Sequence, residues 1–496
     1  MNAFSTVLER FIGEAPFCVL TRALLENVFA PAKLDPLFER HAQTQQTQQL
    51  LFSTAVDLLT DVVLRWRPSV HAAHRAAARH QRIAVSAEAL YQKLRGTEPA
   101  VCRALLRHAA DQVRPLLATL GPPAAPLLPG YELRILDGNH IAATQKRLRV
   151  LRGEGRAARP GLAVAVLDPQ ARLLDDVLFC PDGHAQECRL ALELLTQVRA
   201  GQLYLTDRHF CTSDWLFGLQ RRGGFFLARQ HAGHLRRQLL GERRSCGRAA
   251  TGEVYEQAVQ LTDPTTGEEM TVRRITVALD EPTREGDKEI HLLSNVPPPG
   301  AGEAAGVAAV PLAEAYLARW LIEGAFFELT VNLGCEVNTL GYPGAALLCL
   351  CLAMCCYNLL AAVKAALRVA QGAEAEEALS GYYTAEEVRA TYRGMDIATQ
   401  EEDWKPFQQA GPDTMAGFLR QLARRIDLSY YRKNPVRPKK PHPPKSSSAN
   451  RHAATHRLLN PHQFPAKKRR ASTAKGKSAP APGSPRPPPL CPITPL

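Results

Sequence analysis

The stretch "LYLTDRHFCTSDWLFGLQRRGGFFLA", residues 203–228, carries the pattern from which the fold class of this chain follows. The runs "LYLT" (203–206) and "FFLA" (225–228) are short, apolar and rich in β-prone residues, which is typical of buried strands. The segment from Thr212 to about Leu219 between them is predicted to be a helix. Strand, helix and strand in this order indicate an α/β arrangement.

The segments before this stretch extend the same pattern. Strands are predicted at "LRIL" (133–136), "GLAVAVLD" (161–168) and "RLLDDVLFC" (172–180), and a helix is predicted from Gln186 to about Val198. The order is therefore β-β-β-α-β-α-β, which predicts a mixed sheet with flanking helices.

Changes in apolar spacing and composition divide the rest of the chain into regions. Apolar residues at helical spacing predict an N-terminal helical domain, in which Ser86 is placed to cap one helix and Gly96 to end it. The predicted regions are a helical, DNA-binding N-terminal domain (1–125), the first part of the core (130–230), a β-rich insertion (231–306), the rest of the core (307–370), a helical C-terminal region (371–431) and a basic tail (432–496).

The positive charge of the chain is concentrated in that tail. The net charge is +13, and residues 432–496 contain 15 Lys and Arg and no Asp or Glu, so residues 1–431 together carry −2. The tail is predicted to be disordered, because so polar a segment cannot build a core. We expect it to tether the protein to DNA without regard to sequence, whereas a DNA-binding surface in the folded part has to be a local patch.

Cysteine usage and hydropathy bear on the location of the protein. The 12 cysteines form no CxxC pair and no zinc-ligand spacing, which favours a reducing cytoplasm. The N-terminus has no basic region followed by an apolar run, so no secretory signal is predicted. Residues 345–363, "AALLCLCLAMCCYNLLAAV", are barely long enough to span a membrane and contain Asn358, and a buried core helix is the preferred interpretation.

Two aspartates stand where predicted strands end. Asp137 follows the strand 133–136, and Asp207 follows the strand 203–206. Each has an ordinary alternative, since Asp137–Gly138 suits a turn and Asp207–Arg208 suits an ion pair. In an open α/β sheet, however, ligands gather beyond the carboxyl ends of the strands, which is where both aspartates are expected.

A third carboxylate is expected from the segment "AYLARWLIEGAFFELT", residues 315–330. At about 100° per residue, Tyr316, Arg319 and Glu323 lie within roughly 60° of arc on one helical face. Arg319 and Glu323 suit an exposed ion pair, but the three side chains together also suit a site that holds a phosphate and a metal ion. Glu328 lies about 120° away from Tyr316 around the helix, so Glu323 is the better candidate.

Three carboxylates placed close together repel one another unless protons or cations neutralise them. Mg²⁺ prefers oxygen ligands and binds one or two carboxylates together with phosphate oxygens of a substrate. Two such ions can activate a water and stabilise a leaving oxygen during displacement at phosphorus. The pattern therefore predicts phosphodiester chemistry.

These motifs in this order resemble the bacterial insertion-sequence DDE transposases of the insertion sequence 4 branch. The family motif of Tyr, two residues, Arg, three residues, Glu, six residues and Lys matches Tyr316, Arg319 and Glu323, with Thr330 in place of the Lys. The second-Asp motif matches Asp207, Arg208 and Phe210, and the first matches Asp137 with Gly138. The resemblance covers roughly residues 80–370.

The resemblance implies a ribonuclease-H-like core with the β-rich insertion before the Glu helix. It implies that Asp137, Asp207 and Glu323 are catalytic and hold two Mg²⁺ ions, for which Mn²⁺ could substitute. It also implies contacts to DNA from Tyr316, Arg319 and Arg208, whereas Thr330 cannot neutralise a phosphate as the usual Lys does. The implied partners are the DNA ends of a mobile element, a target DNA and a second copy of the chain.

The sequence thus predicts a Mg²⁺-dependent DNA transposase in the cytoplasm, associated with the nucleoid and with no membrane partner. The alternatives are a decayed or recruited DNA-binding protein and a stand-alone nuclease of the same fold. Two further segments remain open: "PDGHAQE" (181–187) lies near the site or is only a loop entering a helix, and "ARQHAGHLRRQ" (228–238) lines DNA or is a solvated basic loop. "KKRR" (467–470) suits a tail that binds polyanions.

Overall fold

One nine-stranded mixed sheet forms the centre of the computed structural model, which describes residues 4–47, 49–122, 125–231, 233, 235–283, 286–301, 305–434 and 452–464. The strand order is β4-β3-β1-β5-β6-β10-β9-β8-β7. The β1–β5 and β5–β6 pairs are parallel, and the other pairs are antiparallel. The α/β class with a mixed sheet and flanking helices is therefore confirmed.

The strands of the core lie where the sequence predicts them. They are β1 (Glu132–His140), β3 (Leu162–Asp168), β4 (Leu173–Cys180), β5 (Gln202–Thr206) and β6 (Phe225–Arg229). Every residue of β3 is buried, as expected for a strand covered on both faces. The predicted strand 133–136 is too short, because β1 continues to His140 in register with β3.

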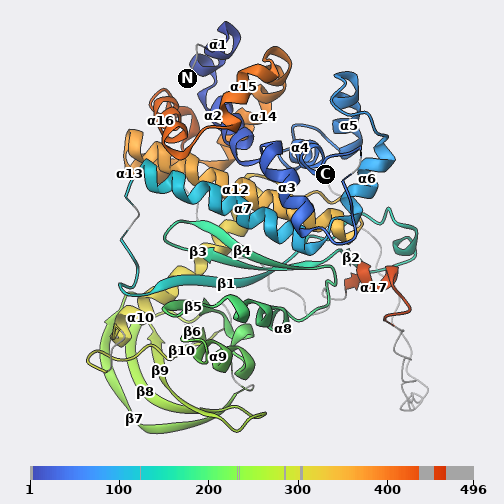
Figure 1. Cartoon of the computed structure of the whole chain (residues 1–496). Helices are drawn as coiled ribbons and strands as arrows, with labels where there is room; N and C mark the ends of the chain where they lie inside the picture. The colour runs from blue at the N-terminus through green and yellow to red at the C-terminus, as the bar shows by residue number, and fades with distance from the viewer. Residues whose placement is uncertain are drawn as a thin grey trace, which may run out of the picture. The chain divides into compact units, whose positions relative to one another are not determined.

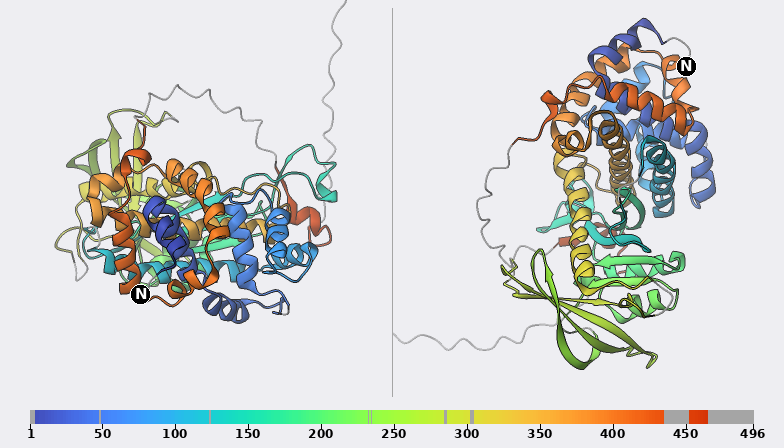
Figure 2. Two further views of the ribbon diagram at one scale, coloured as in Figure 1. Left: turned by 90° about the horizontal axis from the view of Figure 1, so that it is seen from above. Right: turned by 90° about the vertical axis from the view of Figure 1, so that its left-hand side faces the viewer.

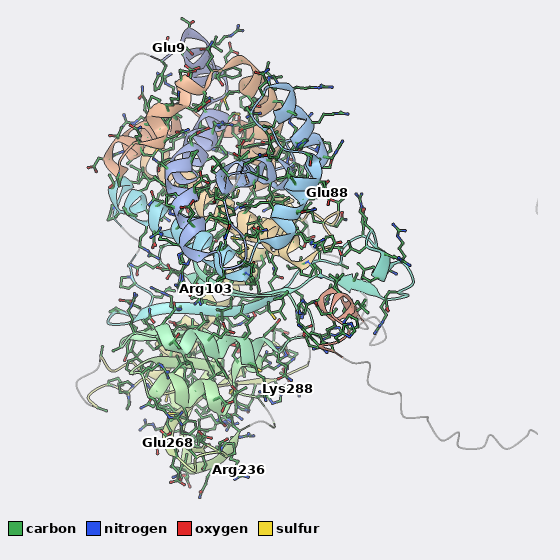
Figure 3. The ribbon with its side chains drawn as sticks, turned by 45° about the vertical axis from the view of Figure 1, so that its right-hand side comes forward. Glu9, Glu88, Arg103, Arg236, Glu268 and Lys288 are labelled. Carbon is green, nitrogen blue, oxygen red and sulfur yellow. The ribbon has the colours of Figure 1, made fainter. Side chains whose placement is uncertain are left out.

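The β-rich segment after β6 continues the same sheet. It contains β7 (Arg236–Ala249), β8 (Gly252–Thr262), β9 (Glu269–Leu279) and β10 (Glu289–Ser294). β10 pairs with β6 and so joins the insertion to the core. The basic loop interpretation of 228–238 is wrong at its end, because β7 begins at Arg236 and pairs with β8. In Figure 3, Arg236 and Glu268 lie at the far end of this extension.

Helices cover both faces of the core sheet (Figure 1). On one face, α7 (Pro99–Leu120) and α12 (Pro343–Gln371) pack on β4 and on each other. On the other face lie α8 (Glu187–Ala191), the 3₁₀ segment η2 (Leu192–Gln197) and α9 (Ser213–Gln220). α12 is long and apolar enough to span a membrane, but 83% of its most apolar window is buried inside the protein, as for a core helix.

The outer helical layer joins the two ends of the folded chain. Helix α2 packs against α14, α15 and α16, as the views in Figures 1 and 2 show, and α6 begins at the Ser86 cap and ends at Gly96 as predicted. The helices of this layer are α1 (Thr6–Glu14), α2 (Pro16–Val28), α3 (Pro31–His41), α4 (Phe52–Val63), α5 (Val70–Arg79), α6 (Ala87–Gly96), α13 (Ala373–Ala378), α14 (Gly381–Ala398), α15 (Glu401–Gln408) and α16 (Pro412–Ala423).

Part of the predicted disordered tail is folded. β11 (His452–Ala454) pairs in parallel with β2 (Ala157–Arg159), and α17 (Thr455–Leu459) follows it. The prediction of disorder from 432 onward is therefore wrong for this segment, because ladder pairing and contacts to distant residues supply what its polar sequence lacks. Residues 435–451 and 465–496 of that prediction lie outside the described residues.

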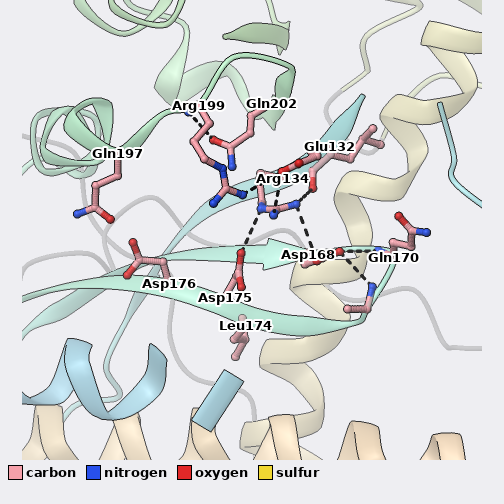
Figure 4. A network of polar contacts seen from close by, with 12 residues as sticks. Glu132, Arg134, Asp168, Gln170, Leu174, Asp175, Asp176, Gln197, Arg199 and Gln202 are labelled. Carbon is pink, nitrogen blue, oxygen red and sulfur yellow. Dashed lines mark hydrogen bonds and ion pairs between the residues drawn. The ribbon is translucent and has the colours of Figure 1, made fainter. Parts of the chain in front are cut away.

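A buried charge network fixes the beginning of β1 (Figure 4). Arg134 Nε lies 3.1 Å from Asp175 Oδ2, and its Nη1 lies 3.8 Å from Asp168 Oδ2. Asp176 accepts paired hydrogen bonds of 2.7–2.9 Å from α7. The arginines of α7 in the network are Arg103, Arg107 and Arg114. Salt bridges thus tie β1, β3, β4 and α7 together at this end.

Candidate active site

Asp137 and Asp207 are neighbours on two parallel strands. β1 and β5 pair so that the residues just before the two aspartates face each other. Ile135 and Leu205, two residues earlier on each strand, both belong to the core beneath α7 and α12. Because side chains alternate along a strand, Asp137 and Asp207 project toward that same side, at the carboxyl end of β5.

Glu323 reaches this point from a helical segment with two irregular turns. α10 (Ala309–Tyr316) leads through the 3₁₀ turn η4 (Leu317–Arg319) into α11 (Trp320–Phe327), and the π turn η5 (Glu328–Asn332) follows. Helix α11 contacts β1. The predicted single helix is thus continuous in direction but tightened at 317–319 and widened at 328–332.

Arg319 joins the first and third carboxylates. Its Nη2 donates to Glu323 Oε1 at 2.8 Å, and its Nη1 lies 3.8 Å from Asp137 Oδ2. The Arg319 side chain is 10% exposed, whereas that of Glu323 is 42% exposed. The pair is therefore not a surface ion pair alone, because the guanidinium is buried against the strand that carries Asp137.

The electrostatics of Asp137 reflect this crowding. The pKa of Asp137 is raised to about 7: burial is the largest cause, Asp207 and Glu323 add to the increase, and Arg319 and the Gly138 amide oppose it. The Gly138 N–H donates to Asp137 Oδ1 at 2.9 Å. Without a cation, the site therefore holds a proton on Asp137 near neutral pH.

Carboxylate oxygens are the donors that a hard divalent cation takes, so these three side chains fit such an ion in kind. Within the described residues, no three His, Cys, Asp or Glu side chains are already arranged as metal ligands. Glu323 is held by Arg319, and Asp207 is held by His209. The hydrogen bond to Arg319 uses Glu323 Oε1, so a cation bound at this site would compete with Arg319 for that oxygen.

His209 is a site residue that the sequence reasoning missed. Asp207 caps the short turn η3 (Arg208–Phe210): its Oδ1 accepts the His209 N–H, and its Oδ2 lies 2.8 Å from His209 Nδ1. The turn is anchored by Phe210, which is buried. Arg208 is half-buried in the same turn. The spacing of Asp and His two residues apart in "DRHF" was the available signal.

Tyr316 supports the site from beneath. Its hydroxyl donates to the carbonyl oxygen of Thr206 at 3.3 Å, and the residue is only 7% exposed. The resemblance implies a DNA contact from Tyr316, but a ring this buried has no free face on which a base could stack in this arrangement. Instead, Tyr316 fixes the start of the Glu323 segment against the end of β5.

Thr330 lies within the π turn, so its position departs from the regular helical stripe. It is half-buried, and its Oγ1 donates to the carbonyl oxygen of Phe326 at 3.0 Å. It lines a small hollow of about 30 Å³ together with Asn139 and His140 of β1. Thr330 therefore lies beside the last residues of β1, which come directly after Asp137.

The segment 181–187 is a loop entering α8 and also borders the site. The Glu187 carboxylate lies over Gly138, where a Cβ would approach it to 2.2 Å, and Glu187 Oε1 is 3.2 Å from His140 Nδ1. Asp182 and His184 point elsewhere, to the segment 452–459. Glu187 therefore supports β1 beside Asp137, on the opposite face of the strand.

Comparison with known families agrees with this geometry. Residues 128–359 match the family model described as "Transposase DDE domain", and this range contains Asp137, Asp207 and Glu323. No curated protein matches the chain. The family match supports a DDE transposase, which is an enzyme class that acts on DNA and generally uses divalent metals.

Proposed function

We propose that this chain, which carries a transposase DDE domain, cuts DNA at the ends of a mobile element and joins the cut ends to target DNA. The observation that supports the proposal best is that Asp207 and Glu323 both lie close enough to Asp137 to raise its pKa, while Arg319 bridges Asp137 and Glu323. The insertion sequence 4 branch and the ribonuclease-H-like core belong to the same proposal, and the order of the strands and the position of the β-rich extension support them.

Asp137, Asp207 and Glu323 would hold two Mg²⁺ ions, or Mn²⁺ in their place. When bound, such ions activate a water or a DNA 3′-hydroxyl and stabilise the leaving oxygen at phosphorus. The raised pKa of Asp137 supports this assignment, because a site that holds a proton for lack of positive charge also favours a cation.

Arg319 has a second task in this proposal. While Glu323 accepts its hydrogen bond, one edge of the guanidinium is used within the protein. If Glu323 turns to a cation, that edge is free to donate to a phosphate oxygen of the DNA. Arg319 would then position the phosphodiester, and Tyr316 and His209 would keep their neighbours in place without touching the substrate.

The proposed partners are duplex DNA and a second copy of the chain on paired element ends. The proposed location is the cytoplasm, on nucleoid DNA. Arg208 remains a proposed DNA contact, since it follows Asp207 in the turn at the end of β5.

The test is an incubation of the full chain with its flanking genomic DNA ends and Mg²⁺. We expect cleaved 3′ ends and strand transfer into a second duplex. Glu323→Gln should abolish both, while Glu314→Gln, an exposed carboxylate on α10, should leave both intact. Mg²⁺ should also raise the thermal stability of the parental protein but not of Glu323→Gln, because a ligand stabilises only the state that binds it.

The rival functions give different results in the same assay. End binding without cutting would indicate a decayed or recruited DNA-binding protein. Cutting without strand transfer would indicate a stand-alone nuclease. Equal activity of Glu323→Gln and the parental protein would contradict the assignment of the site.

A further inference from the structure

The connection from β1 to β3, residues 141–161, folds into a lobe beside the candidate site. Thr144 bridges to Ala158 across the lobe, and the Gln145 N–H donates to the carbonyl oxygen of Asn338 at 2.8 Å. Leu151 is fully buried within it. The lobe is therefore a packed unit rather than a free loop.

The segment 452–459 packs against this lobe (Figure 1). β11 adds a parallel strand to β2, and α17 contacts the 3₁₀ turn η1 (Arg149–Leu151). Arg457 donates to both oxygens of Asp182 at 2.8–3.0 Å, and His184 Nε2 lies 2.9 Å from the carbonyl oxygen of His452. A segment far away in the sequence thus fixes the conformation of the lobe.

The lobe carries an excess of exposed positive charge. Its one acid, Glu154, pairs with Arg156 at 2.8 Å. Among the described residues, no carboxylate side chain pairs with the other exposed cations of the lobe. These cations are Lys146, Arg147, Arg149 and Arg152.

Two exposed arginines on the β7–β10 extension, Arg243 and Arg248, are placed differently. Arg243 pairs with Glu289 at 2.9 Å, and Arg248 pairs with Asp280 at 2.6 Å. Such neighbours neutralise them locally. Four uncompensated cations held on one packed lobe repel one another, which is a cost that an anionic partner would remove.

We propose that the lobe 141–161, held in place by residues 452–459, binds the phosphate backbone of the duplex that enters the site. The inference rests on the proposed function and assigns to that function a DNA contact surface. The lobe begins four residues beyond Asp137 along β1, which is about 13 Å at 3.3 Å per residue. It would therefore contact phosphates of the duplex that flank the cut, and not the phosphate that is cut.

The contacts between the lobe and residues 452–459 support this assignment, because they hold the lobe in one conformation before DNA binds. A free loop that carried the same charges would lose conformational entropy on binding DNA, whereas a folded lobe has already lost it. Because phosphate contacts position a duplex without reading its sequence, the lobe would set the register of the cut strand relative to Asp137 and leave base recognition to other residues.

The experiment compares two full-length variants with equal charge change. The lobe variant combines Lys146→Gln, Arg147→Gln, Arg149→Gln and Arg152→Gln. The control variant removes four exposed cations from α1, α15 and the end of α16, which lie away from the lobe (Figure 1): Arg10→Gln, Lys405→Gln, Arg424→Gln and Arg425→Gln. Fluorescence anisotropy measures the affinity for an element-end duplex across a salt series, and circular dichroism confirms that each variant is folded.

We expect the log–log salt slope of the lobe variant to be shallower by about 3 to 4, at roughly 0.9 per lost phosphate contact. The control variant should change the slope by less than about 1. The duplex flanking the cut should also lose protection from cleavage by hydroxyl radicals in the lobe variant only.

Equal slopes for the lobe and control variants would overturn the inference, since only total charge would then matter. Weaker self-association of the lobe variant with an unchanged DNA slope would assign the lobe to a protein partner and would also overturn it. Failure of the parental protein to bind or cut end DNA is a separate result, because it rejects the proposed function itself.

Discussion

The two ends of β1 hold two groups of carboxylates that differ in how they are neutralised. Near the amino end of β1 and on the adjoining strands β3 and β4, where Asp176 is level with Leu136, each acid meets at least one guanidinium within 4 Å. The acids there are Glu132, Asp168, Asp175 and Asp176, and the arginines are Arg103, Arg107, Arg114, Arg134 and Arg199. Around Asp137, by contrast, the ion pairs of the described residues include a single guanidinium, that of Arg319, for the three carboxylates of Asp137, Asp207 and Glu323. Asp207 is paired with the exposed imidazole of His209.

This difference shows in the pKa values of the acids. Burial alone would raise the pKa of Asp176, but hydrogen bonds from Arg103 and Arg107 outweigh it and lower that pKa. At Asp137, burial and the neighbouring Asp207 carboxylate together raise the pKa to about 7. Carboxylates that are each paired with a guanidinium, which we call matched, therefore stabilise the folded chain. Carboxylates that share too few guanidinium groups, which we call unmatched, form a site that favours a cation.

The largest expected effect is on catalysis. Asp137→Asn, Asp207→Asn or Glu323→Gln should each reduce single-turnover cleavage by roughly a thousandfold or more, because several kcal/mol of charge stabilisation is lost. A double change should cost little more than a single one, since the residues act as a unit. The control is Asp176→Asn at the matched end, whose folded fraction should cut at the parental rate. Near-parental cutting by any of the three variants would remove that residue from the site.

The second effect is on stability: here the change at Asp176 should be the damaging one, and the change at Asp137 should not. Asp176→Asn leaves Arg103 and Arg107 without their shared carboxylate, and breaking a buried ion pair costs about 3 kcal/mol. Asp137→Asn in metal-free protein removes a carboxyl whose ionisation the folded state disfavours, so it should leave the free energy of unfolding unchanged or raise it. Urea denaturation measures both. Equal destabilisation by the two changes would show that the ends of β1 are not different in kind.

The third effect is the pH dependence of metal-free protein. The folded pKa of Asp176 lies below the unfolded value of about 3.9, so its stabilisation is present above that pH and lost as pH falls through the folded pKa. The folded pKa of Asp137 is raised to about 7, so its contribution is complete below about pH 4 and lost as pH rises through 7.

Unfolding free energies measured in EDTA from pH 3 to 8 test these opposite signs. Asp137→Asn should reduce the decline between about pH 4 and 7 by up to about 1.4 kcal/mol per pH unit. Asp176→Asn should reduce the rise in the free energy of unfolding that occurs as pH increases from 3 to about 4. If Asp137→Asn leaves the decline unchanged, the unmatched charge is not at Asp137.

The smallest effect concerns Thr330, which occupies the position of the Lys in the motif that this sequence resembles. Thr330→Lys adds a second cation near the under-neutralised end of β1. If this stretch faces DNA, the log–log salt slope should steepen by about 0.9, one phosphate contact. Val331→Lys, at an exposed neighbour, is the matched control. Equal slopes for both variants and the parental protein would show that this turn does not face the DNA backbone.

Local sequence determined much of this protein. The runs at 161–168 and 203–206 are apolar and rich in β-prone residues, and they form β3 and β5. The cap at Ser86 and the end at Gly96 set α6, because the hydrogen bonds and dihedral angles involved lie within a few residues. The candidate carboxylates could also be chosen from the sequence, since a strand end and a helical face are local features.

Other features depended on residues far apart in the chain. β7 has an arginine-rich sequence typical of a loop, yet it pairs with β8, and β11 forms only because β2 offers a partner. His209 and Tyr316 acquired their positions from turns and contacts that no periodicity describes. The sequence by itself determined the core strands, the capped helices and the acids that are candidates for the site, because hydrophobic periodicity and capping are short-range. Only the tertiary structure decided which acids are matched by arginine, because neutralisation depends on distances of a few ångströms between distant segments.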